Sequence, residues 1–224
     1  MLNSPYSYKQ IFVCYLKRGP DNRGSDSRWA DHQVTSRLII VPGWRDSGPG
    51  HWQSLWAEQL RGAERVTQDD WIAPTRKAWV GSLEKLILSR PEPVVIAAHS
   101  LGCIATAHLG NEAVERVAGA LLVAPADPER RAVLHDFAPV PYAPLPYRSI
   151  VVASSNDPFC PIRLAGAYAR AWGSEFVRMQ NAGHINIDSG HGDWPLGLAL
   201  LQSLTGTPAH RSARRDSIEP LASL

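Results

Sequence analysis

Short runs of consecutive aliphatic residues recur along the middle of the chain, and each run ends in polar or turn-forming residues. Continuous rather than alternating apolar character indicates strands that are buried on both faces, as in a parallel sheet covered by helices. The runs lie at 38–41, 94–98, 117–124 and 149–154, with a shorter and weaker one at 175–178. We therefore predict five strands of a mostly parallel sheet.

Between these runs, apolar residues recur with the three- and four-residue spacing of a helix. The predicted helices contain residues 52–60, 79–87, 101–109, 162–172 and 196–204. Alternation of strands and helices predicts an α/β fold, with a doubly wound sheet and helices on both faces. Right-handed crossovers bring the carboxyl ends of such strands to one edge of the sheet, where ligands bind.

The two ends of the chain differ from this central unit. Residues 1–36 are polar and rich in turn formers, and they cannot bury enough apolar surface to offset the entropy of ordering. Residues 205–224 have a similar character. We predict a flexible N-terminal extension (1–36), one domain with a single sizeable core (37–204) and a flexible C-terminal tail (205–224).

Charge and composition exclude several classes of protein. Lys plus Arg number 23 and Asp plus Glu 21, a balance too even for a protein that grips nucleic acid. We find no apolar run near the roughly 20 residues that cross a bilayer, so no membrane association is predicted. Three unpatterned cysteines and the lack of an evident signal peptide favour a cytoplasmic protein with reduced thiols.

The strand at 94–98 runs directly into the sequence Ala98-His99-Ser100-Leu101-Gly102, which opens the next predicted helix. A sharp turn between strand and helix is the setting of a nucleophile elbow, in which a serine projects from the sheet edge. Ala98 stands where the usual motif has glycine. Ser100 could equally be an ordinary helix N-cap, so residues further along the chain must decide.

Two later strands end in residues that could activate this serine. Asp157 follows the strand at 149–154, and His184 follows the strand at 175–178. A serine hydroxyl needs a base to take its proton, and the base needs a third group to orient it. The order Ser, Asp, His is that of α/β-hydrolases, so we predict a catalytic triad of Ser100, Asp157 and His184.

An oxyanion hole requires two backbone donors, for which we predict the N–H groups of Leu101 and Trp44. Trp44 and Trp71 could form walls of the substrate pocket. His51 could edge the pocket or cap the helix that follows it, and Pro158 lies beside Asp157. The proline-rich stretch 137–147 cannot form a helix, so we expect a stiff rim over the site and no large lid.

Alternatives to these roles come from a glycine-rich loop near the end of the domain. His184, Asp188, His191 and Asp193 are potential metal ligands, but they lack the fixed helical spacing of a zinc motif, and we predict no metal. Asp188 or Asp193 could replace Asp157 as the acid that orients His184. His99 is expected to support the turn, and Cys103 to be a buried core residue.

With these residues assembled, the chain resembles the small serine hydrolases related to retinoblastoma-binding protein nine. The resemblance covers residues 37 to about 204 and rests on Trp56 and on the strings VPGWRDSGPGHWQ (41–53), AHSLG (98–102), SNDP (155–158), AGHIN (182–186) and SGHGDWP (189–195). It implies an α/β-hydrolase fold, a triad of Ser100, Asp157 and His184, and no cofactor. The short motif that binds the retinoblastoma protein is not found, so that partnership is not expected.

These observations predict a serine hydrolase that cleaves carboxylic esters, or small amides, through an acyl-enzyme on Ser100. Its expected partner is a small-molecule substrate, and the short segment available for a lid favours small or exposed substrates. Two other functions are compatible with the sequence: a protein-interaction module with weak catalysis, and an aminopeptidase-like activity.

Overall fold

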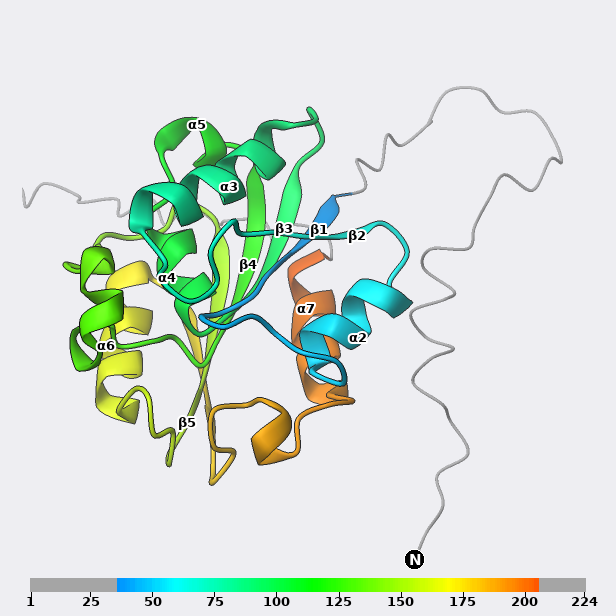
Figure 1. Ribbon diagram of the computed structural model, residues 1–224. Helices are drawn as coiled ribbons and strands as arrows, with labels where there is room; N and C mark the ends of the chain where they lie inside the picture. Colours follow the sequence, from blue (N-terminus) through cyan, green and yellow to red (C-terminus); the bar gives the residue numbers. More distant parts are fainter. Residues whose placement is uncertain (1–35, 206–224) are drawn as a thin grey trace, which may run out of the picture.

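The computed structural model describes residues 36–205. Apart from their boundary residues, the predicted extension (1–36) and tail (205–224) lie outside the described residues. The described part contains a six-stranded sheet in the order β2-β1-β3-β4-β5-β6, and every neighbouring pair is parallel (Figure 1). The predicted α/β fold class is confirmed.

Five of the six strands contain the predicted aliphatic runs. The strands are β1 (Arg37–Val41), β2 (Ala63–Arg65), β3 (Val94–His99), β4 (Val117–Val123), β5 (Arg148–Ser154) and β6 (Glu175–Met179). The three-residue strand β2 was not predicted, because the sequence Ala-Glu-Arg has no apolar run. It lies at the edge of the sheet and pairs only with β1 among the described strands. An edge strand is half-solvated, so its sequence carries a weak signal.

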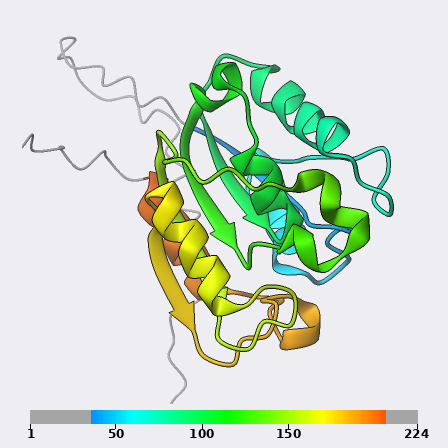
Figure 2. The same cartoon turned by 90° about the vertical axis from the view of Figure 1, so that its left-hand side faces the viewer.

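Helices cover both faces of the sheet (Figures 1 and 2). They are α2 (Trp52–Gln59), α3 (Arg76–Leu88), α4 (Leu101–Ala107), α5 (Asn111–Val114), α6 (Ile162–Trp172) and α7 (Pro195–Thr205). One apolar core joins the sheet to α3, α4, α5 and α6, and another joins it to α2 and α7. Within residues 36–205, none of the helices has both the length and the apolar character needed to cross a membrane.

Tryptophans fill much of both cores. Trp79 and Trp172 are buried on the α3 and α6 side, and Trp52, Trp56 and Trp194 cluster on the α2 and α7 side. Rings of this size bury large apolar areas and stabilise the layers on either side of the sheet. Most tryptophans at helical spacing are therefore core residues, as the sequence predicts.

The segment between β4 and β5 contains only two short 3-10 helices, η1 (Pro128–Arg130) and η2 (Ala132–Phe137), and so no large lid. The proline-rich stretch 137–147, however, does not rim the site as we expected. It packs along α6, where the Leu145 N–H donates to the Trp172 carbonyl (3.0 Å) and Trp172 Nε1 donates to the Pro141 carbonyl (2.8 Å). The buried indole N–H of Trp172 needs an acceptor, and this loop supplies it.

The strand order changes direction between β1 and β3. The chain places β2 on one side of β1, and it places β3, β4, β5 and β6 in succession on the other. In open parallel sheets, a crevice forms at such a switch point, outside the carboxyl ends of the strands. The residues after β1 and β3 are Pro42-Gly43-Trp44 and Ser100, so the fold brings the predicted oxyanion loop and nucleophile together.

Candidate active site

Ser100 occupies the turn between β3 and α4 in a strained conformation, with φ 53° and ψ −120°. A non-glycine residue with positive φ is uncommon and persists only where the surroundings hold it. The Ser100 N–H donates to the Val123 carbonyl (3.0 Å), and the Ser100 carbonyl accepts from the Cys103 N–H (3.0 Å). The Ser100 side chain makes no helix-capping hydrogen bond, so its hydroxyl is not engaged as an N-cap.

Two glycines allow the elbow to pack against the loop after β1. A Cβ atom at Gly102 would lie 2.4 Å from the Val41 carbonyl oxygen, and a Cβ atom at Gly43 would lie 2.7 Å from the Ser100 Cβ. Neither position has room for a side chain, because both distances are well below the sum of the van der Waals radii of the two atoms. The glycines thus hold the backbone of residues 42–44 directly against the turn.

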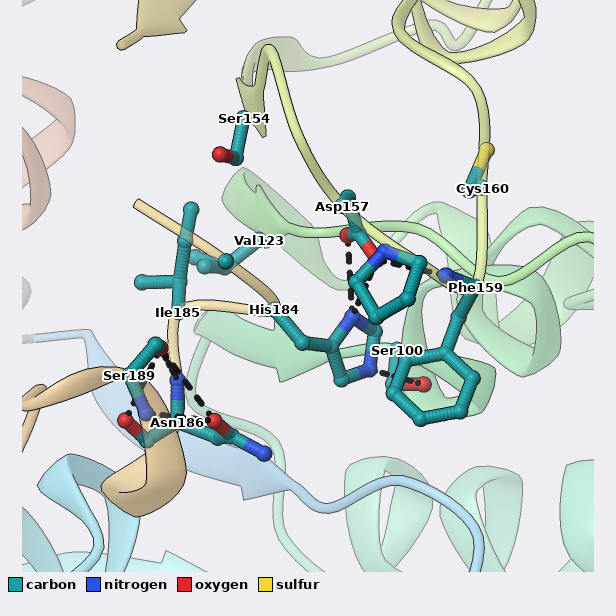
Figure 3. A network of polar contacts seen from close by, with 12 residues as sticks. Ser100, Val123, Ser154, Asp157, Phe159, Cys160, His184, Ile185, Asn186 and Ser189 are labelled. Carbon is teal, nitrogen blue, oxygen red and sulfur yellow. Dashed lines mark hydrogen bonds and ion pairs between the residues drawn. The ribbon is translucent and has the colours of Figure 1, made fainter. Parts of the chain in front are cut away.

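Ser100, His184 and Asp157 form a continuous hydrogen-bonded line (Figure 3). Ser100 Oγ lies 3.0 Å from His184 Nε2, and His184 Nδ1 lies 3.0 and 2.9 Å from the two carboxylate oxygens of Asp157. A carboxylate only accepts, so the neutral imidazole carries its proton on Nδ1 and leaves Nε2 free to accept from the serine hydroxyl. This geometry allows a proton to move from the serine to the histidine.

The loop that carries His184 has an irregular backbone. Asn181, Gly183 and Ile185 all have positive φ, at 51°, 57° and 50°. A Cβ atom at Gly183 would lie 2.6 Å from the Ser189 Cβ, so glycine is required there. Ile185 is fully buried, and its carbonyl accepts from Trp52 Nε1 (3.0 Å) on the far helix α2. Contacts that are remote in sequence therefore hold this loop in place.

Two polar residues that the sequence analysis did not single out connect the loop of Asp157 to the loop of His184. Buried Ser154 Oγ accepts from the Ala182 N–H (2.9 Å) and donates to Asn156 Oδ1 (2.8 Å), which in turn accepts from the Gly183 N–H (2.8 Å). Their position at the carboxyl end of β5, within the string Ser-Ser-Asn-Asp-Pro, is the signal that could have identified them.

His99 and His51 form a row of imidazole rings with His184. Ring centroids are 4.9 Å apart for His51 and His99, and 4.8 Å apart for His99 and His184. His99 Nε2 lies 2.9 Å from the His184 carbonyl, which can only accept, so this nitrogen donates. His99 thus helps to hold the backbone of the loop that carries His184.

Burial keeps both supporting imidazoles neutral. Loss of solvation and the neighbouring His184 hold the pKa of His99 well below its usual value. The same two causes, with Arg65 and His191, lower the pKa of His51 to about 4. His51 Nδ1 accepts from the Gln53 N–H (3.1 Å) and so caps helix α2, one of the two roles we considered for it.

Gln53 is a further residue that the sequence analysis did not assign. Its fully buried amide donates to the carbonyls of Val41 (2.9 Å) and Ala97 (3.0 Å), and its oxygen accepts from Ser47 Oγ (2.6 Å). The amide therefore bridges the ends of β1 and β3 at the switch point. A glutamine within an apolar helix face was the available signal.

A cleft of about 670 Å³ opens above Ser100 and His184. Of the four predicted pocket residues, Trp44, His51 and Pro158 line it. Trp71 does not: it lies edge-on to Trp79, with ring centroids 5.5 Å apart, because the chain after β2 folds onto α3. The remaining lining residues include Phe159, Leu134, Ala126 and several charged side chains from the loop after β1, from η1 and the two residues that flank it, and from the loop after His184.

The predicted oxyanion donors are free. Within residues 36–205, neither the Trp44 N–H nor the Leu101 N–H donates a hydrogen bond to another protein group. The Trp44 side chain is anchored through Nε1 to the Ile72 carbonyl (2.9 Å). Free backbone N–H groups beside a nucleophile are what an oxyanion hole requires.

Rival chemistries fit the site less well. Within the described residues, no three His, Cys, Asp or Glu side chains are grouped to hold a metal. Asp157, not Asp188 or Asp193, lies against His184 Nδ1. Burial raises the pKa of the Cys160 thiol to about 12 and that of Cys103 well above its usual value, so neither is a ready thiolate.

Comparison with known proteins identifies the family of the chain. A family model described as serine hydrolase matches residues 38–203, and the chain belongs to this family. The protein is therefore a serine hydrolase with an α/β fold. No curated protein matches the chain.

Solved structures share the fold. A putative YdeN-like hydrolase from Pectobacterium atrosepticum is 29% identical, with a TM-score of 0.73, and the match covers 89% of this chain and 97% of that one. The ydeN gene product of B. subtilis is 21% identical, with a TM-score of 0.65 and coverage of 76% and 98%. An esterase from Thermogutta terrifontis is 15% identical, with a TM-score of 0.58 and coverage of 76% and 91%. The relation to the retinoblastoma-binding branch stays a prediction.

Proposed function

We propose that this serine hydrolase cleaves carboxylic esters through an acyl-enzyme on Ser100. The observation that carries the proposal is the hydrogen-bonded line from Ser100 Oγ through His184 to Asp157 at the base of the cleft. The strained turn at Ser100 supports it, because strain at a non-glycine residue is typical of functional positions. The esterase among the structures of similar fold agrees with this reaction class.

In the first half of the reaction, His184 Nε2 takes the proton of Ser100 Oγ as that oxygen attacks the ester carbonyl carbon. The N–H groups of Leu101 and Trp44 bind the oxyanion that forms. Asp157 accepts from Nδ1 and stabilises the imidazolium. His184 then gives its proton to the leaving alcohol as the carbon–oxygen bond breaks, which leaves the acyl group on Ser100.

In the second half, a water molecule takes the place of the alcohol. His184 removes a proton from the water as its oxygen attacks the acyl carbon, and the proton returns to Ser100 Oγ when the acid departs. Apart from the ester and this water, each step uses only Ser100, His184, Asp157 and the two backbone N–H groups. Esters are favoured over amides as substrates, because an alcohol is the better leaving group.

The test is labelling by a fluorophosphonate probe together with hydrolysis of short-chain 4-nitrophenyl esters. Ser100→Ala should abolish labelling and lower kcat by about 10⁴-fold or more, since the members of such a triad act as a unit. His184→Ala should lower kcat by a similar factor. Ser203→Ala removes an exposed hydroxyl on α7 and should leave both readouts unchanged.

Circular dichroism should show that the variants keep the fold. The proposal would be overturned if the wild-type protein reacted with neither the probe nor the esters. It would also be overturned if Ser100→Ala kept the wild-type rate.

A further inference from the structure

Three arginines line the same cleft as Ser100: Arg45, Arg130 and Arg131. Arg130 donates to the Pro158 carbonyl (3.0 Å). Within residues 36–205, the side chains of Arg45 and Arg131 form neither a hydrogen bond nor an ion pair with the protein. Both are solvent-exposed, so their guanidinium groups are available to a ligand.

Aromatic rings hold these two free guanidinium groups. Arg131 Cζ lies 5.5 Å from the centroid of the Trp44 ring and 5.1 Å from that of the Phe159 ring, and Arg45 Cζ lies 4.4 Å from the Trp44 ring. Packing against a ring restricts a guanidinium group and leaves N–H donors at its edge. An edge of this kind binds a carboxylate through two parallel hydrogen bonds.

The two rings that Arg131 contacts flank the reacting groups. The Phe159 ring lies 4.5 Å from the His184 ring, centroid to centroid, and Figure 3 shows it on the Ser100 side of the imidazole. Trp44 follows Gly43, which packs directly on Ser100. Arg131 therefore lines the cleft in contact with two rings, one beside His184 and the other next to Gly43.

Three carboxylates, Asp46, Asp127 and Asp188, also line the cleft, but none of them forms an ion pair with these two cations. Asp46 pairs with Arg65 on β2. Asp127 accepts from the Glu129 N–H (3.1 Å) and caps η1. Asp188 lies in η3 (Ile187–Ser189), and among the described residues no carboxylate is within ion-pair distance of Arg45 or Arg131.

We propose that Arg131, with Arg45 beside it, binds a carboxylate carried by the substrate, so that the esters this enzyme prefers are anionic. The inference rests on the proposed esterase function and deepens it by naming the substrate class. Arg131 is then a specificity residue: it binds a part of the substrate that does not react. Binding energy from such a remote group raises kcat/KM for substrates that possess it.

The test uses two pairs of esters, each matched in shape and differing in one charge. One pair carries the difference on the acyl part: the 4-nitrophenyl monoester of adipate and the 4-nitrophenyl ester of adipamate. The other carries it on the alcohol part: 4-acetoxyphenylacetate and 4-acetoxyphenylacetamide. In at least one pair, the wild-type kcat/KM should be about tenfold higher for the carboxylate, in line with a hydrogen bond to a charged group.

Arg131→Gln should reduce that preference to below about twofold, because kcat/KM falls more for the carboxylate ester than for its neutral partner. Arg131→Lys keeps the charge without the planar fork and should retain only part of the preference. Arg163→Gln removes the same charge from the exposed surface of α6 and should keep the full preference. Loss of the preference in Arg163→Gln as well would assign it to net charge and overturn the role of Arg131.

Equal rates on both members of both pairs would overturn the inference and leave the esterase function standing. A preference that survives Arg131→Gln would also overturn it. A wild-type protein that is inert to all four esters and to the fluorophosphonate probe would instead overturn the proposed function itself, so the two failures are distinguishable.

Discussion

The two sides of the candidate active site are built in different ways. On the serine side, close backbone packing defines the geometry: Gly43 and Gly102 let the loop after β1 touch the turn at Ser100. On the histidine side, hydrogen bonds define it, from Ser154, Asn156, His99 and Trp52. The serine side should therefore be sensitive to added volume, and the histidine side to the loss of polar groups and to acid.

The largest effect is expected at Gly102. Gly102→Ala places a methyl group 2.4 Å from the Val41 carbonyl oxygen, a backbone atom that cannot rotate away. Overpacking of this kind should lower the free energy of unfolding by roughly 3 kcal/mol and abolish fluorophosphonate labelling. Urea unfolding and probe labelling measure the two effects.

Gly81→Ala is the matched control. Gly81 lies within α3, and a Cβ atom there meets nothing within 4 Å. The free energy of unfolding of this variant should rise by up to about 1 kcal/mol, because alanine is more favourable than glycine in a helix interior. Equal behaviour of the two variants would contradict the view that backbone contact defines the serine side.

Acid should weaken the histidine side. The pKa of His51 is about 4 in the folded protein and about 6.5 when unfolded, so between these values the unfolded chain binds a proton that the folded protein does not. Stability is therefore lost as the pH falls through this window. From pH 7 to pH 5, protonation of His51 alone should lower the free energy of unfolding by on the order of 2 kcal/mol.

The comparison is with His51→Asn, in which the asparagine oxygen can still cap α2 but cannot titrate. Urea unfolding at pH 7 and pH 5 should show a smaller loss for the variant, by about 2 kcal/mol. An identical loss in both proteins would mean that His51 does not couple acid to stability.

The smallest effect on stability is expected at Ser154. Ser154→Ala leaves the buried Ala182 N–H without its acceptor, which should cost roughly 1–2 kcal/mol. Because this bond helps to place His184, kcat for ester hydrolysis should fall by about tenfold, with little change in KM. Steady-state kinetics and urea unfolding measure both.

Ser203→Ala on the surface of α7 again serves as the control and should change neither quantity by a measurable amount. A Ser154→Ala variant with wild-type kcat would show that the histidine loop keeps its position without this hydroxyl, and the contrast between the two sides would disappear.

Most of the strands and the position of the candidate nucleophile could be predicted from the sequence, because they depend on residues that are neighbours along the chain. Continuous aliphatic runs mark β1, β3, β4 and β5, a shorter apolar pair marks β6, and the pentapeptide around Ser100 lies where a strand meets a helix. Parallel strands share one edge for their carboxyl ends, so Ser100, Asp157 and His184 could be assigned to that edge before their distances were known. The pentapeptide alone could not choose between Ser100 as a helix cap and Ser100 as a nucleophile, and it was Asp157 and His184, each after a later strand, that favoured the nucleophile.

Only the tertiary structure decided the features that depend on contacts remote along the chain. Strand β2 is defined by its pairing with β1, and the stretch 137–147 lies along α6 because Trp172 requires an acceptor. Trp71 packs on Trp79 and away from the cleft, while Arg131 meets Trp44 and Phe159 from two other loops. Such positions depend on how separate segments pack in three dimensions. Residue type and spacing within one segment do not predict these contacts between segments.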